Sequence, residues 1–148
     1  MKVNVIINPT FKEDIEVDIK AQKEDERIAK ITSILNESNE KNLVGYEAEK
    51  FVILDLKKIY YFSTENGKVF AHLEKEKYLV KKRIFELLEY VKDKPNWFLI
   101  NQGAIANLDN VLRMETYFNG SIVIVFNNNE KEYASRIQTS LLKKKLGL

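Results

Sequence analysis

The 148-residue sequence has no cysteine, one histidine and two prolines. The absence of cysteine excludes disulfides, thiolate metal sites and a cysteine nucleophile, and it fits a reducing compartment. The single His72 excludes any site that needs two imidazoles, and its place inside a predicted strand favours a structural role over that of a general base. The sequence also has no glycine-rich phosphate loop and no nucleophile elbow. We therefore expect no enzyme activity and no cofactor.

Long apolar runs are missing as well. The N-terminal stretch "MKVNVIINPTFKEDIEV" has apolar residues that are broken by asparagine and proline and followed by charges. This pattern resembles neither a signal peptide nor a membrane-spanning helix, so we expect a cytoplasmic protein. With 45% apolar residues, the chain can bury a core and form one domain with at most a small appendage.

Charge is distributed unevenly although the net charge is only +2. Residues 1–40 hold six Lys or Arg against nine Asp or Glu, whereas residues 131–148 hold five basic residues and one acid. A local basic excess of this kind can bind phosphates. On composition alone, a solvated helix end with lysines opposite the helix dipole is the commoner explanation.

Residues 1–40 are predicted to form a strand–strand–helix unit. Residues 2–8 and 14–20 alternate β-branched and polar side chains, which predicts two short paired strands. Residues 23–37 begin with acids and place apolar side chains at helical spacing, which predicts an amphipathic helix. The polar run at residues 36–42 is the candidate linker.

The rest of the chain is predicted to consist mainly of short strands, so the expected fold class is mainly β with α. Asn66-Gly67 and Asn119-Gly120 lie between strand-like runs and predict tight hairpins. Helices are predicted at residues 81–93 and 136–148, the second with Ile137, Leu141 and Leu142 packed. A hairpin is predicted at residues 43–56, and further strands at residues 59–64, 68–73, 77–81, 97–101, 111–118, 121–127 and 131–135.

Three stretches together carry a family resemblance: residues 57–91, residues 97–111 and residues 121–148. Their sharpest parts are "AIANLDNV" at residues 104–111 and "SRIQTSLLKKKLG" at residues 135–147. In order and spacing they resemble the LytTR family of bacterial DNA-binding domains, over about Gly45 to Leu148. The acidic strand–strand–helix preface is similar to the short stand-alone branch of that family, which lacks a receiver domain.

The resemblance implies an elongated stack of small, mostly antiparallel sheets with little helix. It also implies that loops between strands reach into successive grooves of duplex DNA, instead of one recognition helix lying in a major groove. Residues 45–148 would then be the DNA-binding domain, and residues 1–40 a unit for dimerisation or signal input. We expect a homodimer at least on DNA, with a membrane protein encoded nearby as a further candidate partner and no small-molecule substrate.

The resemblance places DNA contacts in three segments: the turn after the aromatic strand, the loop before "AIANLDNV", and the start of the terminal helix. Lys68 could reach a phosphate, and Gln102 could pair with adenine. The candidate DNA-binding residues are Asn66, Gly67, Lys68, Asn101, Gln102, Arg136, Gln138 and Lys143.

This chain departs from the family pattern at four positions. Relatives often have a basic residue and then serine where it has Gln102 and Gly103, and a second arginine where it has Ile137. Gln138 stands where an aromatic residue is usual. Isoleucine cannot make a bidentate contact with guanine, a loss of roughly 1–3 kcal/mol of discrimination at that base pair. Ile137 could touch a thymine methyl group or pack into the core, and we expect packing.

Two function classes follow from these residues. The first is a sequence-specific transcriptional regulator that binds paired promoter sites. The second is a protein-interaction module with the same fold that has lost strong DNA binding. For Arg136, a surface salt bridge to Glu130 or Glu132 is as well supported as a DNA contact. An enzyme would require a cleft of perturbed carboxylates or tyrosines.

Overall fold

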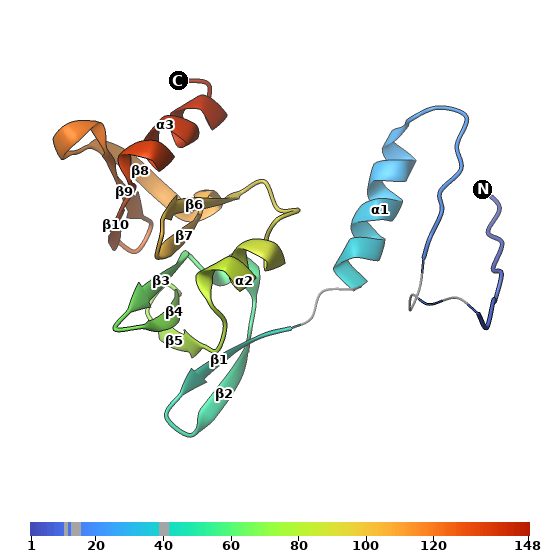
Figure 1. Ribbon diagram of the computed structural model, residues 1–148, viewed down its shortest axis with the longest axis horizontal. Coiled ribbons are helices and arrows are strands. Elements are labelled where there is room, and N and C mark those ends of the chain that lie inside the picture. The colour runs from blue at the N-terminus through green and yellow to red at the C-terminus, as the bar shows by residue number, and fades with distance from the viewer. Residues whose placement is uncertain (11, 13–15, 39–41) are drawn as a thin grey trace. The chain divides into compact units, whose positions relative to one another are not determined.

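The computed structural model describes residues 1–10, 12, 16–38 and 42–148. The chain divides into two compact units, Met1–Lys41 and Asn42–Leu148 (Figure 1). Among the described residues, no helix combines the length and the apolar character needed to cross a membrane.

The Met1–Lys41 unit contains α1 (Glu26–Ser38), which confirms the predicted helix. Asp25 begins it, since its Oδ1 accepts a hydrogen bond from the Arg27 backbone N–H at 2.8 Å. The two predicted strands are wrong where the structure describes them, because residues 2–8 and 16–20 are not in strands; residues 14 and 15 lie outside the described residues. Alternation shows only a capacity to pair, and a strand without a stable partner sheet gains too little to persist.

In residues 42–148, ten strands form two antiparallel sheets (Figure 1). The larger sheet has the order β2-β1-β5-β4-β3-β7-β6 and the smaller one has the order β10-β9-β8. The strands of the larger sheet are β1 (Leu43–Glu47), β2 (Lys50–Leu54), β3 (Tyr61–Glu65), β4 (Lys68–His72), β5 (Lys77–Val80), β6 (Trp97–Asn101) and β7 (Ala104–Asn107). The strands of the smaller sheet are β8 (Val111–Thr116), β9 (Ile122–Phe126) and β10 (Lys131–Tyr133).

Local turn chemistry explains the hairpins. Asn66 and Gly67 join β3 to β4 with φ values of 50° and 77°, and two positive φ values are what a tight type I′ hairpin turn requires. Asn119 and Gly120 lie in the longer connection between β8 and β9, residues 117–121, and they also have positive φ values, 60° and 76°. The predicted hairpins and the mainly β, α+β class are therefore confirmed.

The central strands β3 and β7 of the larger sheet are buried on both faces. Phe62 and Ile105 lie on the face covered by α2 (Ile84–Tyr90), in a core that includes Leu87 and Trp97. Tyr61, from the alternate position of β3, belongs to the second core. That core includes Ile124 and Phe126 of the smaller sheet and Leu142 of α3 (Arg136–Lys145). Tyr61 and Phe62, neighbours on β3, thus face opposite cores, and Tyr60, just before the strand, packs partly against the second core.

The terminal helix α3 packs through Thr139 and Leu142, which are 2% and 0% exposed. The prediction that Ile137 packs is wrong, because this side chain is 74% exposed. At 100° per residue, Ile137 lies on the side of the helix opposite Thr139 and Leu142. Leu141 is also half exposed, so of the three residues of α3 that were predicted to pack, only Leu142 is fully buried.

Candidate nucleic-acid interface

Hydrogen bonds bring the three predicted contact segments together on one surface of the Asn42–Leu148 unit. The Thr64 N–H, next to the β3–β4 turn, donates to the Gly103 carbonyl of the β6–β7 turn at 2.8 Å. The Ser135 N–H, at the start of α3, donates to the Ile100 carbonyl at the end of β6, also at 2.8 Å. We call the β3–β4 turn, the β6–β7 turn and the first turn of α3 the three-segment surface.

Asn101 ties two of these segments together through its side chain. Its Oδ1 accepts from the Gly103 N–H at 2.8 Å, and its Nδ2 donates to the Tyr133 carbonyl at 2.7 Å. Because both polar atoms of the amide are engaged within the protein, Asn101 fixes the shape of the β6–β7 turn relative to the chain that leads into α3. The family resemblance predicts Asn101 as a DNA-contact residue, but nothing in the sequence indicates this positioning role.

Gln102 stands at the tip of the β6–β7 turn and is exposed. Its neighbour Gly103 has space for a side chain, since an added Cβ would lie 3.5 Å from the Thr64 Cβ, an ordinary contact distance. The fold therefore does not require glycine at this position. Gly103 lacks the hydroxyl group of the family's serine, although the fold has space for that side chain.

Arg136 is exposed in the first turn of α3. Among the described residues, none of its candidate salt-bridge partners is paired with it. Glu130 Oε2 lies 3.6 Å from His72 Nδ1, and Glu132 Oε2 accepts from the Tyr133 N–H at 3.3 Å. The guanidinium is thus available for a ligand outside the protein.

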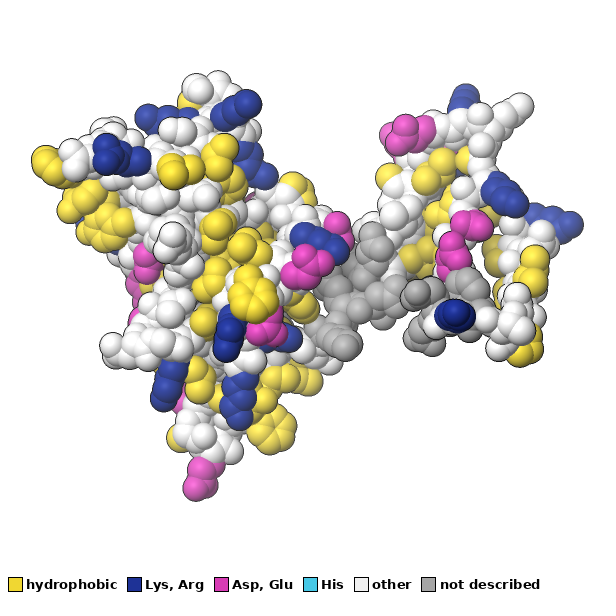
Figure 2. All heavy atoms as spheres, viewed as in Figure 1, with side chains coloured by type: hydrophobic (Ala, Val, Ile, Leu, Met, Phe, Trp, Pro, Cys, Tyr) yellow, Lys and Arg dark blue, Asp and Glu magenta, His cyan; other side chains and the backbone are white. Residues whose placement is uncertain are grey.

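The start of α3 has a regular cap. Ser135 is the N-cap residue, and its Oγ accepts from the Gln138 N–H at 3.2 Å. Gln138 itself is half-buried, whereas Lys143 is exposed and lies seven residues after Arg136, on the same side of the helix. Lys and Arg side chains gather over α3 and again over the region of β4 and β5 (Figure 2).

The buried His72 joins the two sheets below this surface. Its Nε2 is 2.7 Å from Ser63 Oγ, and its ring stacks on Tyr61 with centroids 4.0 Å apart. Tyr61 in turn stacks on Phe126 of the smaller sheet at 4.6 Å. Burial lowers the pKa of His72 and raises the pKa of Tyr61, so both side chains are held neutral. This arrangement confirms the structural interpretation of the histidine.

Asn107, in the middle of "AIANLDNV", is 1% exposed. Its Nδ2 donates to the Ile59 carbonyl at 3.0 Å, and its Oδ1 accepts from Asn96 Nδ2 at 3.0 Å and from the Asp109 N–H at 3.1 Å. The motif asparagine is therefore part of the framework that holds β7 between β3 and β6. Within the described residues, no cluster of three or more His, Asp or Glu side chains is arranged to hold a metal ion.

The helices of the Asn42–Leu148 unit do not form a helix–turn–helix. In residues 42–148, which the structure describes completely, α2 and α3 are separated by β6 to β10. Instead, the unit exposes Lys68 and Gln102 at two turns and Arg136 at the start of α3. The fold and this surface define a mainly antiparallel α+β domain with exposed polar and cationic groups at two inter-strand turns and at the start of a helix.

Comparisons with known proteins agree with this class. The family model of the LytTr DNA-binding domain matches residues 49–147. The chain therefore belongs to the LytTR family of DNA-binding domains.

The chain is also similar to full-length bacterial proteins in sequence and to a solved domain in structure. Uncharacterised HTH-type transcriptional regulators of Staphylococcus aureus strains NCTC 8325, COL and N315 are each 27% identical to it over 150 residues, covering 100% of this chain and 99% of the relative. The LytTr DNA-binding domain of a protein described as a methyl-accepting/DNA response regulator from Bacillus cereus has a TM-score of 0.66 at 16% identity. That match covers 73% of this chain and 99% of the solved one, and it shows the same fold.

Proposed function

We propose that this chain is a sequence-specific transcriptional regulator that contacts duplex DNA through the three-segment surface. The observation that carries the proposal is that hydrogen bonds hold the two turns and the start of α3 together, with Arg136, which forms no ion pair among the described residues, at their edge. The family match and the names of the staphylococcal relatives, which describe them as transcriptional regulators, support the same function.

Each segment has a distinct chemical role in this proposal. Gln102 and Arg136 offer hydrogen-bond donors to base edges, and an arginine can bind O6 and N7 of guanine together. Lys68 and Lys143 bind phosphates, which sets the register of the protein on the duplex. The start of α3 adds free backbone N–H groups and the positive end of the helix dipole, both of which favour a phosphate. Asn66 and Gly67 shape the turn that presents Lys68.

The partner in this proposal is promoter DNA in the cytoplasm. Two copies bind paired sites, so a homodimer forms at least on DNA. The Met1–Lys41 unit serves dimerisation or signal input, for which a membrane protein encoded nearby is a candidate. No small-molecule substrate or catalytic step is required.

Simultaneous Arg136→Ala and Lys68→Ala substitutions test the proposal. Removing one base reader and one phosphate contact is expected to weaken binding to the DNA upstream of the gene by roughly 10- to 100-fold. The measurement is fluorescence anisotropy with a labelled duplex. Lys57→Ala with Lys58→Ala is the control, because both lysines are exposed and lie outside the three-segment surface. Equal binding by both double variants, with unchanged thermal unfolding, would refute the assigned contacts.

A second candidate is a protein-interaction module with the same fold. One observation favours it: Ile137 and Phe118 are 74% and 75% exposed, and Leu141 of α3 is 49% exposed. Ile137 and Leu141 are four residues apart and therefore lie on the same side of α3, and exposed apolar groups that lie together mark protein-binding surfaces. This candidate predicts that the Arg136 and Lys68 substitutions leave DNA binding unchanged.

A further inference from the structure

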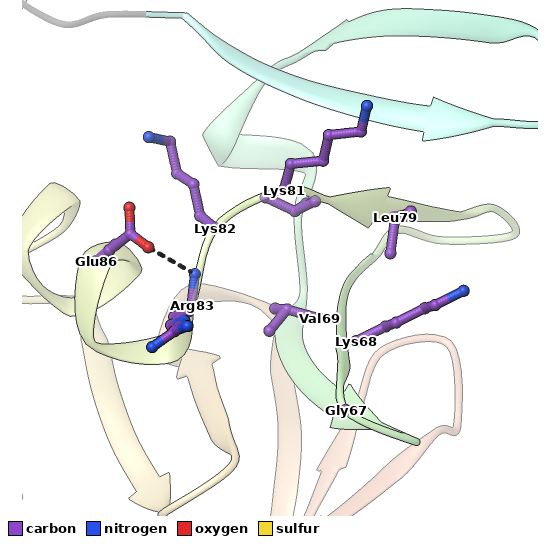
Figure 3. A pocket seen from close by; sticks show the side chains of 9 residues that line it. Gly67, Lys68, Val69, Leu79, Lys81, Lys82, Arg83 and Glu86 are labelled. Carbon is purple, nitrogen blue, oxygen red and sulfur yellow. Dashed lines mark hydrogen bonds between the residues drawn. The ribbon is translucent and has the colours of Figure 1, made fainter.

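A shallow groove lies next to the β3–β4 turn, between the ends of β4 and β5 and the start of α2. Val69, Leu79 and Val80 line its apolar part. Four cationic side chains also line it, as Figure 3 shows: Lys68, Lys81, Lys82 and Arg83. Glu86 is the single acidic residue among the lining residues.

The acid of the groove does not neutralise these cations. Glu86 Oε1 accepts from the Arg83 backbone N–H at 3.2 Å, the contact drawn as a dashed line in Figure 3. This bond caps the first turn of α2. Within the part of the chain that the structure describes, none of the four cations forms an ion pair with a carboxylate. The Lys81 ammonium lies 4.2 Å from the Tyr46 ring centroid, a cation–π contact and not an ion pair.

Strand register gathers the cationic residues at one end of β4 and β5. Val69 pairs with Val80, so Lys68 at the start of β4 and Lys81 directly after β5 come next along the two chains. Like charges that lie close together repel one another. Lys82 and Arg83 follow directly and add to the repulsion. An anionic ligand would relieve it.

The directions of the side chains indicate which anion fits. In Figure 3, Lys68, Lys81 and Lys82 point away from one another around the groove, and Arg83 points along the opposite side from Lys68. A single small anion would require the charged groups to converge on one point. A chain of phosphates, spaced at about 3.4 Å per nucleotide along the duplex axis, suits cations that are spread out.

We propose that this groove binds the sugar–phosphate backbone of duplex DNA beside the base pairs that the β3–β4 turn contacts. Gly67 and Lys68 belong both to that turn and to the groove lining, so one DNA strand that passes the turn would continue into the groove. The inference rests on the proposed function and extends it, because it adds a set of sequence-independent contacts outside the three-segment surface.

The test compares two triple variants of the full chain that lose the same charge. The groove variant carries Lys81→Gln, Lys82→Gln and Arg83→Gln, and it keeps Lys68 because that residue also serves the turn. The control variant carries Lys57→Gln, Lys58→Gln and Lys75→Gln, three exposed lysines outside the groove. Affinities for the upstream DNA and for shuffled DNA of equal composition are measured by anisotropy over a series of salt concentrations. Thermal unfolding shows that both variants are folded.

The groove variant is expected to lose roughly 10- to 100-fold in affinity for both DNAs, with their ratio unchanged, because phosphate contacts carry no sequence information. Its slope of log K against log salt is expected to be shallower than that of the wild type by about 2 to 3, whereas the control changes little. Phosphate-ethylation interference is expected to show two or three backbone positions at one flank that matter to the wild type but not to the groove variant.

The outcomes separate the groove from the proposed function. If the wild type prefers the upstream DNA but the groove variant binds like the control, the groove inference is wrong and the regulator remains. If the wild type binds both DNAs equally and the groove variant loses that binding, the groove inference stands and base recognition fails. If the wild type binds neither DNA, both are overturned.

Discussion

At the residue scale, Ile137 is exposed by 74% in the first turn of α3, directly after Arg136. An apolar side chain at that position can contact the 5-methyl group of thymine in the major groove, whereas an arginine there could donate hydrogen bonds to guanine. We therefore propose Ile137 as a specificity determinant of this chain.

Deoxyuridine substitution tests this role, because it removes only the thymine methyl group. Replacing thymines of the bound site one at a time is expected to weaken wild-type binding about fourfold at one position, the equivalent of one buried methyl group. Ile137→Ala is expected to bind the thymine and deoxyuridine duplexes equally, whereas Leu141→Ala keeps the wild-type difference. Anisotropy titrations measure each pair. A wild type that is insensitive at every thymine would exclude the contact.

Some site residues could be located from the sequence, and others depend on contacts between distant parts of the chain. Lys68, Gln102 and Arg136 could be assigned to turns and a helix start because Asn-Gly pairs, polar tips and an N-cap serine have local signatures. The bond from the Asn101 side chain to the Tyr133 carbonyl could not be predicted, because the two residues are 32 positions apart. The exposure of Ile137 depended on which side of α3 packs, and the sequence allowed both.

At the element scale, β4 meets the smaller sheet through His72. The groups that face its ring are Tyr61, Ser63 and Glu65 of β3, Lys77 of β5 and Glu130 of the β9–β10 turn. Burial outweighs the attraction of Glu65 and Glu130 and lowers the pKa of His72 below its ordinary value of 6.5. The folded state therefore binds the proton less readily than the unfolded state does.

The lowered pKa of His72 predicts how the stability of the fold depends on pH. As the pH falls through about 6.5, the unfolded state gains the imidazole proton first, so the free energy of unfolding decreases until the pH reaches the lower pKa of the folded state. Urea unfolding curves recorded at pH values above and below about 6.5 are expected to show this loss. His72→Gln, whose amide can still bind Ser63, is expected to lose that part of the dependence. An equally large decrease in the variant would contradict the assignment to His72.

Strands differ in how far they can be predicted locally. The β3–β4 and β8–β9 hairpins carry their own turn signals and form as expected. Residues 2–8 have the β-branched alternation of a strand but are not in one, because pairing needs a partner that the segment itself does not encode. Conversely, β7 was not predicted as a separate strand. Its two alanines have little strand propensity, and it forms because β3 and β6 pair with it on either side.

At the scale of the whole molecule, the Asn42–Leu148 unit has one large sheet with α2 on one face and the smaller sheet and α3 on the other. This layering places the ends of β3, β6 and the start of α3 next to one another, although they are far apart in the sequence. Family resemblance predicted the three segments, but only long-range pairing shows that they share one surface.

The most direct test of DNA recognition by this surface is the discrimination of the wild-type protein between two DNAs. Fluorescence anisotropy would compare the region upstream of the gene with shuffled DNA of equal composition, each at two salt concentrations. Base recognition predicts a preference for the upstream DNA of at least about 1,000-fold that persists at the higher salt. Weak binding to both duplexes that disappears at the higher salt would contradict sequence-specific regulation.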